Sequence, residues 1–414
     1  MVLEIRLRNI YSIKDEVVLD LRAGGSKSQQ TQRLQANTFT CKDGQILKSV
    51  AIYGANASGK SNIIKAIHQS VRMILQSHLH NENAVFDMRP FKFDGYPQKP
   101  SSFSIRFMIQ ETEYEYAFSF NHNGIMTENL YHSPNGRRAK IFTRNEAPGK
   151  EKSKIYSFTA AIRKPLDVAE NTSRKTLYLS RASQMDREIA KTVYKFFAQK
   201  IAFNHLSGNL FVYLEFEKSK ELLLHALKIA DTDIVDFKIN FLNKMIDSSY
   251  NNNPTSGIAQ ESAELLPIIT FHQNNPKIPF DFAKEESAGT QILFRLMMVI
   301  LDSVRNNKLL LIEEIGSNLH SKIVEYIIEL FHASNSAQIV YTTHNTNLLN
   351  LHKLRKDQIY FVNKRIDGSS DLYSLFNYKD FRDTMDVEKA YLQGRFDAIP
   401  NIDDRPEILR TLTK

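Results

Sequence analysis

The chain has 414 residues, of which 42% are hydrophobic and 24% are charged, and its formal net charge is +8 at pH 7. This composition excludes disordered and fibrous proteins. The single cysteine, Cys41, excludes an internal disulfide and favours a reducing compartment. The first residues lack the apolar run of a signal peptide, and the longest apolar stretch, residues 292–301, is interrupted by Arg295. We therefore expect a cytoplasmic protein without membrane contact.

The positive charge is concentrated between Arg137 and Lys200. This segment contains sixteen Lys and Arg residues and six Asp and Glu residues, a surplus of +10, so the rest of the chain has a net charge of 8 − 10 = −2. Such an excess attracts nucleic-acid phosphates or an acidic partner protein. A solvated, lysine-rich surface is the third interpretation. No base-reading motif accompanies the segment, so recognition of a nucleic-acid sequence is not expected.

The first half of the chain changes from one periodicity to another. Residues 2–21 alternate apolar and polar, which predicts a strand pair with a turn near residues 12–15. After a polar loop, residues 47–53 form an apolar run typical of a buried strand, and residues 63–75 have the apolar spacing of a helix. A period of two then predicts four antiparallel strands, at residues 102–109, 114–120, 125–132 and 140–143.

The second half begins with a helical pattern over residues 186–230, followed by a connection at residues 247–257 that is flexible by composition. After Pro267 the pattern predicts two short strands and a long helix from about Thr290. Strand and helix patterns then alternate to about Phe376, as in a parallel sheet with crossover helices. A helical stretch follows Asp386.

A phosphate-binding motif stands between the buried strand and the first helix. Residues 54–61, GANASGKS, match G-x-x-x-x-G-K-[ST]. The glycines let backbone N–H groups surround the α- and β-phosphates, and the start of the helix adds its positive dipole end. Lys60 would reach the β- and γ-phosphates, and the Ser61 hydroxyl would coordinate Mg²⁺. The residues expected to bind ATP here are Gly54, Asn56, Gly59, Lys60, Ser61 and Asn62.

Two later strands end in polar residues suited to hydrolysis. The run LLLI at residues 309–312 is followed by Glu313 and Glu314, and the strand near residues 338–341 is followed by Thr342, Thr343 and His344. Ligands of open α/β sheets bind at the carboxyl ends of the strands. We expect Glu313 to hold the Mg²⁺ hydration shell, Glu314 to polarise the attacking water and His344 to sense the γ-phosphate.

The order of these elements resembles that of the ABC-type ATPases related to SMC proteins. Residues 284–291, KEESAGTQ, look like the signature motif of that family, which opens a helix. The resemblance implies that Ser287 and Gly289 complete the nucleotide site of the opposite subunit, and that residues 316–320 touch that subunit. It also places Gln184 where the family has a glutamine that links Mg²⁺ to the β lobe.

More narrowly, the chain resembles compact ATPases of prokaryotic anti-phage defence, the abortive-infection RloA/AbiL-like and PARIS AriA-like group. The segments that carry this likeness include IRLRNIYSI, AIYGANASGKSNIIKAI, EESAGTQ, EEIGSNLH and EKAYLQGRFDAIP. Glu313 replaces the Asp of most relatives, which implies slow turnover, and the signature lacks the double glycine of transporters. No room remains after the ATPase for a Toprim nuclease domain, so the resemblance implies a separate effector, a Toprim-like nuclease or another toxin.

The expected fold class is α/β, a P-loop ABC-type ATPase head with a mixed or parallel sheet, an antiparallel β lobe and a helical insertion. The predicted segments are an N-terminal core part (1–100), the lobe (101–160), the insertion (161–260), a C-terminal core part (261–376) and a tail (377–414).

Three functions fit this organisation. The first is an ATP-hydrolysing defence sensor that acts as a homodimer or higher oligomer. The second is a RecF-like DNA-repair clamp, and the third is a scaffold that binds nucleotide without hydrolysing it.

Overall fold

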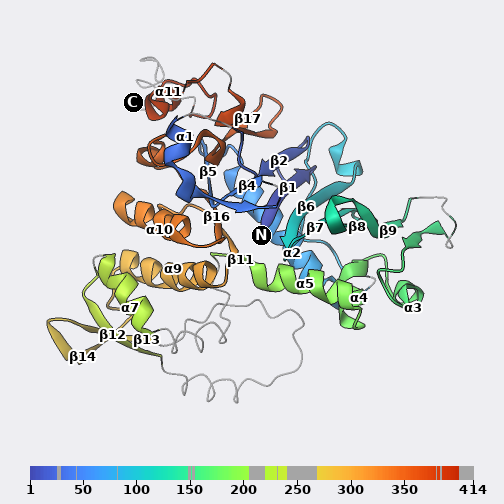
Figure 1. Ribbon diagram of the computed structural model, residues 1–414, viewed down its shortest axis with the longest axis horizontal. Helices are drawn as coiled ribbons and strands as arrows, with labels where there is room; N and C mark the ends of the chain where they lie inside the picture. Colours follow the sequence, from blue (N-terminus) through green and yellow to red (C-terminus); the bar gives the residue numbers. More distant parts are fainter. Residues whose placement is uncertain are drawn as a thin grey trace, which may run out of the picture.

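The structure is a computed structural model (Figure 1). It describes residues 1–25, 29–42, 44–81, 83–147, 151, 154–204, 220–230, 232–239, 268–378, 380–382 and 385–400. The predicted connection at residues 247–257 lies outside the described residues.

A six-stranded sheet forms the centre of the fold, in the order β11-β15-β16-β5-β17-β18. The first five strands pair in parallel, and β18 pairs antiparallel with β17 at the edge. The bounds are β11 (Ile201–Phe203), β15 (Leu309–Ile312), β16 (Gln338–Thr342), β5 (Ser49–Gly54), β17 (Ile359–Lys364) and β18 (Ser370–Ser374). The predicted alternation of strands and crossover helices is thereby confirmed.

Each strand of this sheet supplies side chains alternately to two cores, because successive side chains point to opposite faces. On β5, Val50 and Ile52 join one core, whereas Ala51 and Tyr53 join the other. The first core includes α2 (Lys60–Gln76). The second includes three helices, α9 (Ala288–Arg305), α10 (Ser321–Ala333) and α11 (Val387–Leu392). Burial on both faces explains the apolar runs of β5 and β15.

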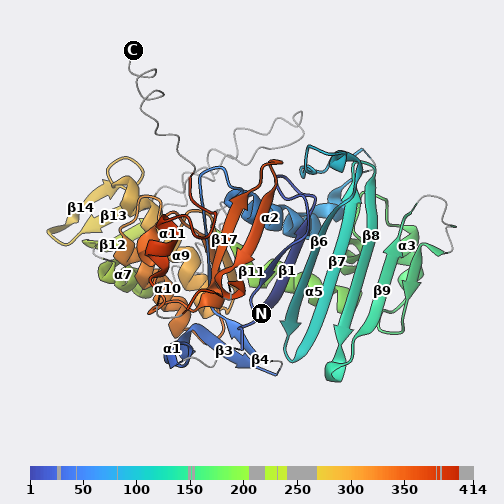
Figure 2. The same cartoon turned by 90° about the horizontal axis from the view of Figure 1, so that it is seen from above.

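A seven-stranded antiparallel sheet forms the lobe, in the order β10-β9-β8-β7-β6-β1-β2 (Figure 2). Its strands are β10 (Tyr156–Phe158), β9 (Ala139–Asn145), β8 (Gly124–Ser133), β7 (Thr112–Asn121), β6 (Ser101–Ile109), β1 (Val2–Arg8) and β2 (Val17–Asp20). The four strands predicted between residues 102 and 143, and the strand pair at the N-terminus, are confirmed.

The predicted boundary at residue 100 does not separate the lobe from the N-terminal segment. Strand β1 pairs with β6, with Ile5 opposite Ile105 and Leu7 opposite Phe103. The pairing places apolar side chains opposite one another on the face that packs into the core. The lobe therefore includes residues 2–20, which is a correction to the segment predicted for residues 101–160.

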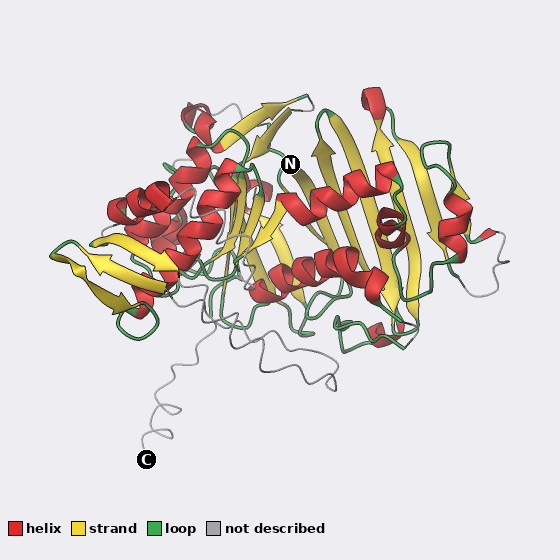
Figure 3. Ribbon diagram, turned by 90° about the horizontal axis from the view of Figure 1, so that it is seen from below, coloured by secondary structure: helices red, strands yellow, loops and turns green. Residues whose placement is uncertain are grey.

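Three helices of the predicted insertion cover one face of the lobe sheet (Figure 3). They are α3 (Pro165–Glu170), α4 (Tyr178–Gln184) and α5 (Glu188–Lys200). Phe196 stacks on Phe107 of β6 with ring centroids 4.3 Å apart. Strand β11 then adds to the central sheet beside β15. Residues 161–203 are thus mainly helical, as predicted for the insertion, and they contribute to both sheets.

Smaller elements complete the described chain. A three-stranded sheet, β12 (Ile234–Ile239), β13 (Ile268–His272) and β14 (Asn275–Asp281), joins α7 (Lys220–Ile229) and α9 through contacts such as that of Phe237 with Phe294. A short hairpin, β3 (Thr38–Cys41) and β4 (Gly44–Leu47), follows α1 (Gln29–Arg33).

Candidate functional site

The phosphate loop lies where the sequence predicts it, between the carboxyl end of β5 and the start of α2. Asn56 is exposed on the crest of the loop, whereas Ser58 is buried. A Cβ added to Gly54 would lie 2.5 Å from the backbone oxygen of Val362, so only glycine allows β17 to approach this closely. The loop therefore leaves the end of the central sheet in a constrained conformation.

The ammonium group of Lys60 folds back over the loop. Its Nζ donates hydrogen bonds to the backbone oxygens of Gly54, at 2.8 Å, and Ala55, at 2.9 Å. Burial lowers the pKa of Lys60 to about 8, although the nearby carboxylate of Glu314 opposes the shift. A buried cation held only by carbonyl oxygens is suited to bind a phosphate, because a second anion adds charge pairing that the carbonyl groups do not supply.

Two serines distant in sequence, Ser12 and Ser370, lie against Gly59 and stabilise the phosphate loop. Gly59 has φ +109°, and a Cβ there would lie 2.0 Å from Ser370 Oγ and 2.7 Å from Ser12 Oγ. Ser370 Oγ donates to the backbone oxygen of Ser58 at 2.6 Å and bonds Ser12 Oγ at 2.7 Å. Asn62 Nδ2 donates to Ser12 Oγ at 2.8 Å. The structure thus turns Asn62, a predicted ATP ligand, toward this support.

Sequence reasoning missed Ser12 and Ser370, because no spacing in the chain marks an ordinary hydroxyl that a distant loop brings to the phosphate motif. Ser12 comes from the turn between β1 and β2, and Ser370 opens β18. Both β17 and β18 therefore contribute to the rigidity of the loop, one by backbone contact and one by hydrogen bonding.

The acids and the histidine meet the phosphate loop at the carboxyl edge of the sheet. Glu314, with φ +52°, follows β15 in a turn whose backbone N–H donates to the buried Thr342 Oγ1 at 2.9 Å. His344 Nε2 lies 4.0 Å from Glu314 Oε1. Burial and the Lys60 ammonium lower the pKa of His344, so the ring is neutral at pH 7. Glu314, His344 and Lys60 thus lie close together at one edge of the sheet, while their roles in hydrolysis stay predictions.

The side chains predicted to hold magnesium offer oxygen atoms, the donors that this ion prefers. Ser61 lies on the first turn of α2, and Glu313 is half-buried at the end of β15, where its backbone oxygen accepts from Asn204 Nδ2 at 3.5 Å. The described residues contain no group of three His, Cys, Asp or Glu side chains that could hold a metal by themselves. In nucleotide sites Mg²⁺ takes one or two protein oxygens and completes its shell with phosphate and water.

The predicted signature motif begins α9, which packs on the face of the central sheet opposite α2. Ser287 is the N-cap of α9, and its Oγ accepts from the Thr290 N–H at 3.0 Å. Ser287 and Ala288 are exposed. A Cβ on Gly289 would lie 3.2 Å from the backbone oxygen of Asn318, so the start of α9 contacts the loop that follows the acids. The helix N-terminus and this loop therefore share one exposed surface.

The two helix N-termini belong to opposite faces of the central sheet. Helix α2 packs against α4, α5, β1 and β5, whereas α9 packs against α7, α10 and β15. Their apolar side chains fall in different cores. Lys60 and Ser287 therefore stand at the starts of two helices that pack on opposite faces of the central sheet.

Gln184 belongs to the helices that follow the lobe strands. It is exposed at the end of α4, and α4 contacts the short turn after α2 through the bond of His78 with Ser180. Helix α2 has 17 residues, so about 25 Å of helix separate that end from Lys60. This geometry gives no support to the magnesium role of Gln184, which stays a prediction.

A comparison with known protein families identifies the family of this chain. Residues 49–350 match the family described as "AAA domain, putative AbiEii toxin, Type IV TA system". The chain belongs to this family. The matched residues begin with β5 and extend past His344, so the family model spans the phosphate loop, the signature helix and the acids. A search of curated proteins found no match.

Solved structures with similar folds include three SMC head domains. The SMC head bound to the C-terminal winged-helix domain of ScpA is 16% identical, with a TM-score of 0.41 over 94% of this chain and 99% of that chain. The SMC head domain from Thermotoga maritima is 13% identical, with a TM-score of 0.39 over 90% and 98%. An Smc head bound to the C-terminal domain of ScpA derived from Pyrococcus furiosus is 16% identical, with a TM-score of 0.38 over 100% and 99%.

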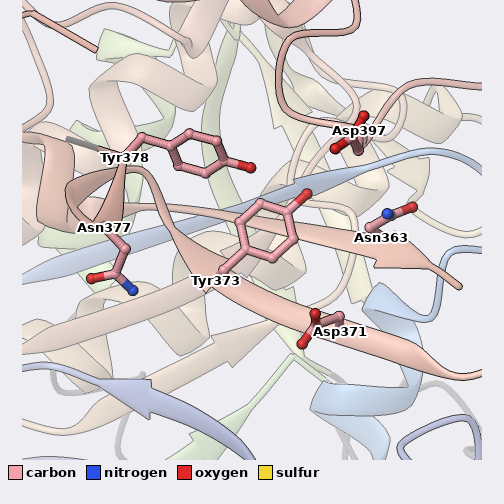
Figure 4. Close-up of a pocket in the computed structure, with 6 residues that line it drawn as sticks. All are labelled: Asn363, Asp371, Tyr373, Asn377, Tyr378 and Asp397. Carbon is pink, nitrogen blue, oxygen red and sulfur yellow. The ribbon is translucent and has the colours of Figure 1, made fainter. Parts of the chain in front are cut away.

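A cavity of about 370 Å³ lies away from the family's phosphate motif, at the free edge of the central sheet (Figure 4). Its lining residues are Asn363, Asp371, Tyr373, Asn377, Tyr378 and Asp397. Two carboxylates repel a triphosphate, and Asp371 is already paired with Arg365 at 2.6 Å. This cavity is therefore not the nucleotide site.

Ion pairing neutralises part of the basic segment between residues 137 and 200. Arg144 is fully buried beside Glu128, and Arg138 bonds Glu115 at 3.0 Å. Arg187 and Lys191 pair with Asp167 and Asp186. Arg137, Arg163, Lys164 and Lys195 remain exposed. Asp167 and Asp186 are already counted in the surplus of this segment, so only Glu115 and Glu128, which lie outside it, lower the surplus further. None of the described helices is long and apolar enough to cross a membrane.

Proposed function

We propose that this protein is an ATP-hydrolysing switch of a prokaryotic anti-phage defence system, in which ATP and Mg²⁺ close a head-to-head dimer that controls a separate effector. The observation that carries the proposal is the division of the site. Lys60, Glu314 and His344 gather at one edge of the sheet, whereas the capped N-terminus of α9 is exposed on the other layer. Two chains in antiparallel orientation would join these halves around one triphosphate, an isologous arrangement that closes on itself.

Each group has a distinct part in this reaction. The Lys60 ammonium would pair with the β- and γ-phosphates, and Ser61 with Glu313 would hold Mg²⁺ and its water shell. Glu314 would orient and polarise the attacking water, while the neutral ring of His344 would bond the γ-phosphate. Ser287 and the N–H groups near Gly289, from the second chain, would bind the same phosphate at a helix N-terminus. The reaction would be completed only in the dimer.

Family membership supports the defence setting, because the description of the family names a toxin of a toxin–antitoxin system. The part played by an effector, whether a Toprim-like nuclease or another toxin, belongs to this proposal. In the RecF-like alternative the lobe would bind DNA, but the pairing of Arg138, Arg187 and Lys191 with acids leaves fewer cations for phosphates. DNA binding that falls steeply with salt would favour that alternative.

Replacing Glu314 by Gln tests the proposal. The amide keeps the size of the side chain but loses the charge that polarises water, so we expect hydrolysis to fall by about 100-fold or more while ATP stays bound and dimer accumulates. Sedimentation velocity with and without ATP measures the dimer, and phosphate release measures turnover. Glu329→Gln, at an exposed position on α10, is the matched control and should behave like the wild type. Equal hydrolysis by E314Q and wild type would refute the role of Glu314, and ATP retention without turnover in the wild type would identify the non-hydrolysing scaffold.

A further inference from the structure

His272 lies between two carboxylates, one at each ring nitrogen. Nδ1 is 2.8 Å from Asp233 Oδ1, and Nε2 is 2.8 Å from Glu286 Oε1. An ionised carboxylate only accepts hydrogen bonds, and a neutral imidazole has a single N–H. Both bonds therefore form together only when the ring carries two protons, which makes the geometry itself specific for the imidazolium ion.

The histidine connects three elements around the signature segment. His272 ends β13, Asp233 precedes β12, and Glu286 stands in the segment between β14 and α9 (Figure 1). From β14 the uncharged ring of Phe280 packs on His272, with centroids 4.5 Å apart. Among the described residues, Asp233 and Glu286 are the charged groups that act on this ring. The titratable side chain of His272 thus links the three-stranded sheet to the segment that precedes α9.

Glu286 transmits this contact to the helix end, because it directly precedes the N-cap Ser287. Its side chain is only 6% exposed, and the Thr270 hydroxyl also donates to it. Gln291 Nε2, one turn into α9, donates to the backbone oxygen of Glu286 at 3.0 Å. A displacement of the Glu286 carboxylate would therefore move the backbone that precedes Ser287. A purely structural link between the sheet and the helix would explain the three contacts of Glu286. Such a link gives no reason why the two hydrogen bonds of His272 need a charged ring beside the signature motif.

We propose that His272 is a positioning residue for the proposed reaction: as imidazolium it holds Glu286, and so orients Ser287 and the start of α9 toward the triphosphate bound by a second copy of the chain. This inference rests on the proposed function. Protonation of His272 then favours ATP-dependent closure, and loss of that proton loosens the signature segment.

The direction of the pH dependence follows from the charges. Burial alone lowers the pKa of His272, but the hydrogen bonds to Asp233 and Glu286 outweigh it, so the pKa is raised above 6.5. A raised pKa means that the contact is fully formed below about pH 6.5 and is lost as pH rises through the folded-state value. Closure should therefore weaken with rising pH at a midpoint above 6.5.

ATP-dependent dimerisation of the full chain in the E314Q background, followed by sedimentation velocity from pH 6 to pH 9, tests this proposal. ATP is kept saturating at each pH, because Lys60 loses its proton near pH 8 and ATP affinity falls above that pH. The dimer dissociation constant should rise about tenfold across the midpoint, the size expected for one charge-assisted hydrogen bond. His272→Gln, which carries no titratable proton, should dimerise weakly at every pH and show no midpoint. His225→Gln, on the exposed side of α7, is the control and should keep the wild-type profile.

A second variant keeps the test valid if H272Q folds poorly. Asp233→Asn retains a hydrogen-bond acceptor but removes one charge, so the midpoint should move to lower pH. An H272Q profile equal to the wild type, or an unmoved midpoint in D233N, would overturn the inference alone. Absence of ATP-dependent dimer at every pH in the parent protein would overturn the proposed function, and with it this inference. Fluorescent-ATP binding to the monomer, which depends on Lys60, should be unchanged in all three variants.

Discussion

Replacing Gly59 by Ala measures how far the serine support behind the phosphate loop constrains that loop. The new Cβ would lie 2.0 Å from Ser370 Oγ, 2.7 Å from Ser12 Oγ and 2.9 Å from Ser370 Cβ. Since real Cβ contacts do not fall below 3.0 Å, both serines must move. Their displacement would break the bonds from Ser370 to Ser58 and to Ser12, and that from Asn62 to Ser12.

The expected loss of stability has two parts. A residue with Cβ at φ +109° costs about 1–2 kcal/mol in backbone strain. Three broken hydrogen bonds add about 3 kcal/mol at about 1 kcal/mol each. Gly44 separates the two parts, because it has φ +124° and nothing within 4 Å of an added Cβ. Gly44→Ala should therefore show the strain alone, and G59A should exceed it by about 3 kcal/mol.

Urea denaturation of both variants gives the two free energies of unfolding, and calorimetric titration with ATP gives the affinity. Adding Ser370→Gly to G59A removes the contacts at 2.0 and 2.9 Å, so the double variant should recover part of the loss. If G59A and G44A are equally stable, the serine support does not constrain the loop and the reasoning is refuted.

Two further predictions follow from charged groups. Since the pKa of Lys60 is lowered to about 8, ATP affinity should be constant below that pH and fall above it by about tenfold per pH unit, because the neutral amine cannot pair with phosphate. Titration with ATP from pH 6.5 to 9.5 measures this affinity. An equally steep fall in the Lys60→Met variant would contradict the prediction. Arg144 and Glu128 are both fully buried, and Nη1 of Arg144 lies 3.7 Å from Oε2 of Glu128. Arg144→Met leaves the Glu128 carboxylate without this cation, so urea denaturation should show a loss of about 3–5 kcal/mol in the free energy of unfolding. Adding Glu128→Gln should restore part of that loss, and no restoration would show that the pair is not the cause.

The parts of the fold that sequence predicts well are those fixed by local periodicity. The strands from β6 to β9 follow from alternating apolar residues, and β5 with α2 follows from a buried run, a glycine loop and a helical spacing. Glu314 and His344 were predictable because carboxyl ends of parallel strands share one edge, whichever strands lie next to each other.

The parts that sequence could not supply depend on contacts between distant segments. The sequence of residues 2–20 does not predict whether β1 pairs with β6 or with the central sheet. The place of Gln184 has the same character, because its distance from Lys60 depends on the end of α2 that α4 approaches. Ser12 and Ser370 are hydroxyls without a motif, and only the folded chain brings them to Gly59.

The central claim is that one triphosphate is bound by Lys60 of one chain and Ser287 of another. Mixing the Lys60→Ala and Ser287→Arg chains, each expected to be inactive alone, tests it directly through ATP hydrolysis. In a mixed dimer one site regains both residues, so an equal mixture should recover about a quarter of wild-type activity, since half of the dimers are mixed and each has one intact site. A mixture as inactive as its separate components, under conditions in which mixed dimers are shown to form, would contradict the claim.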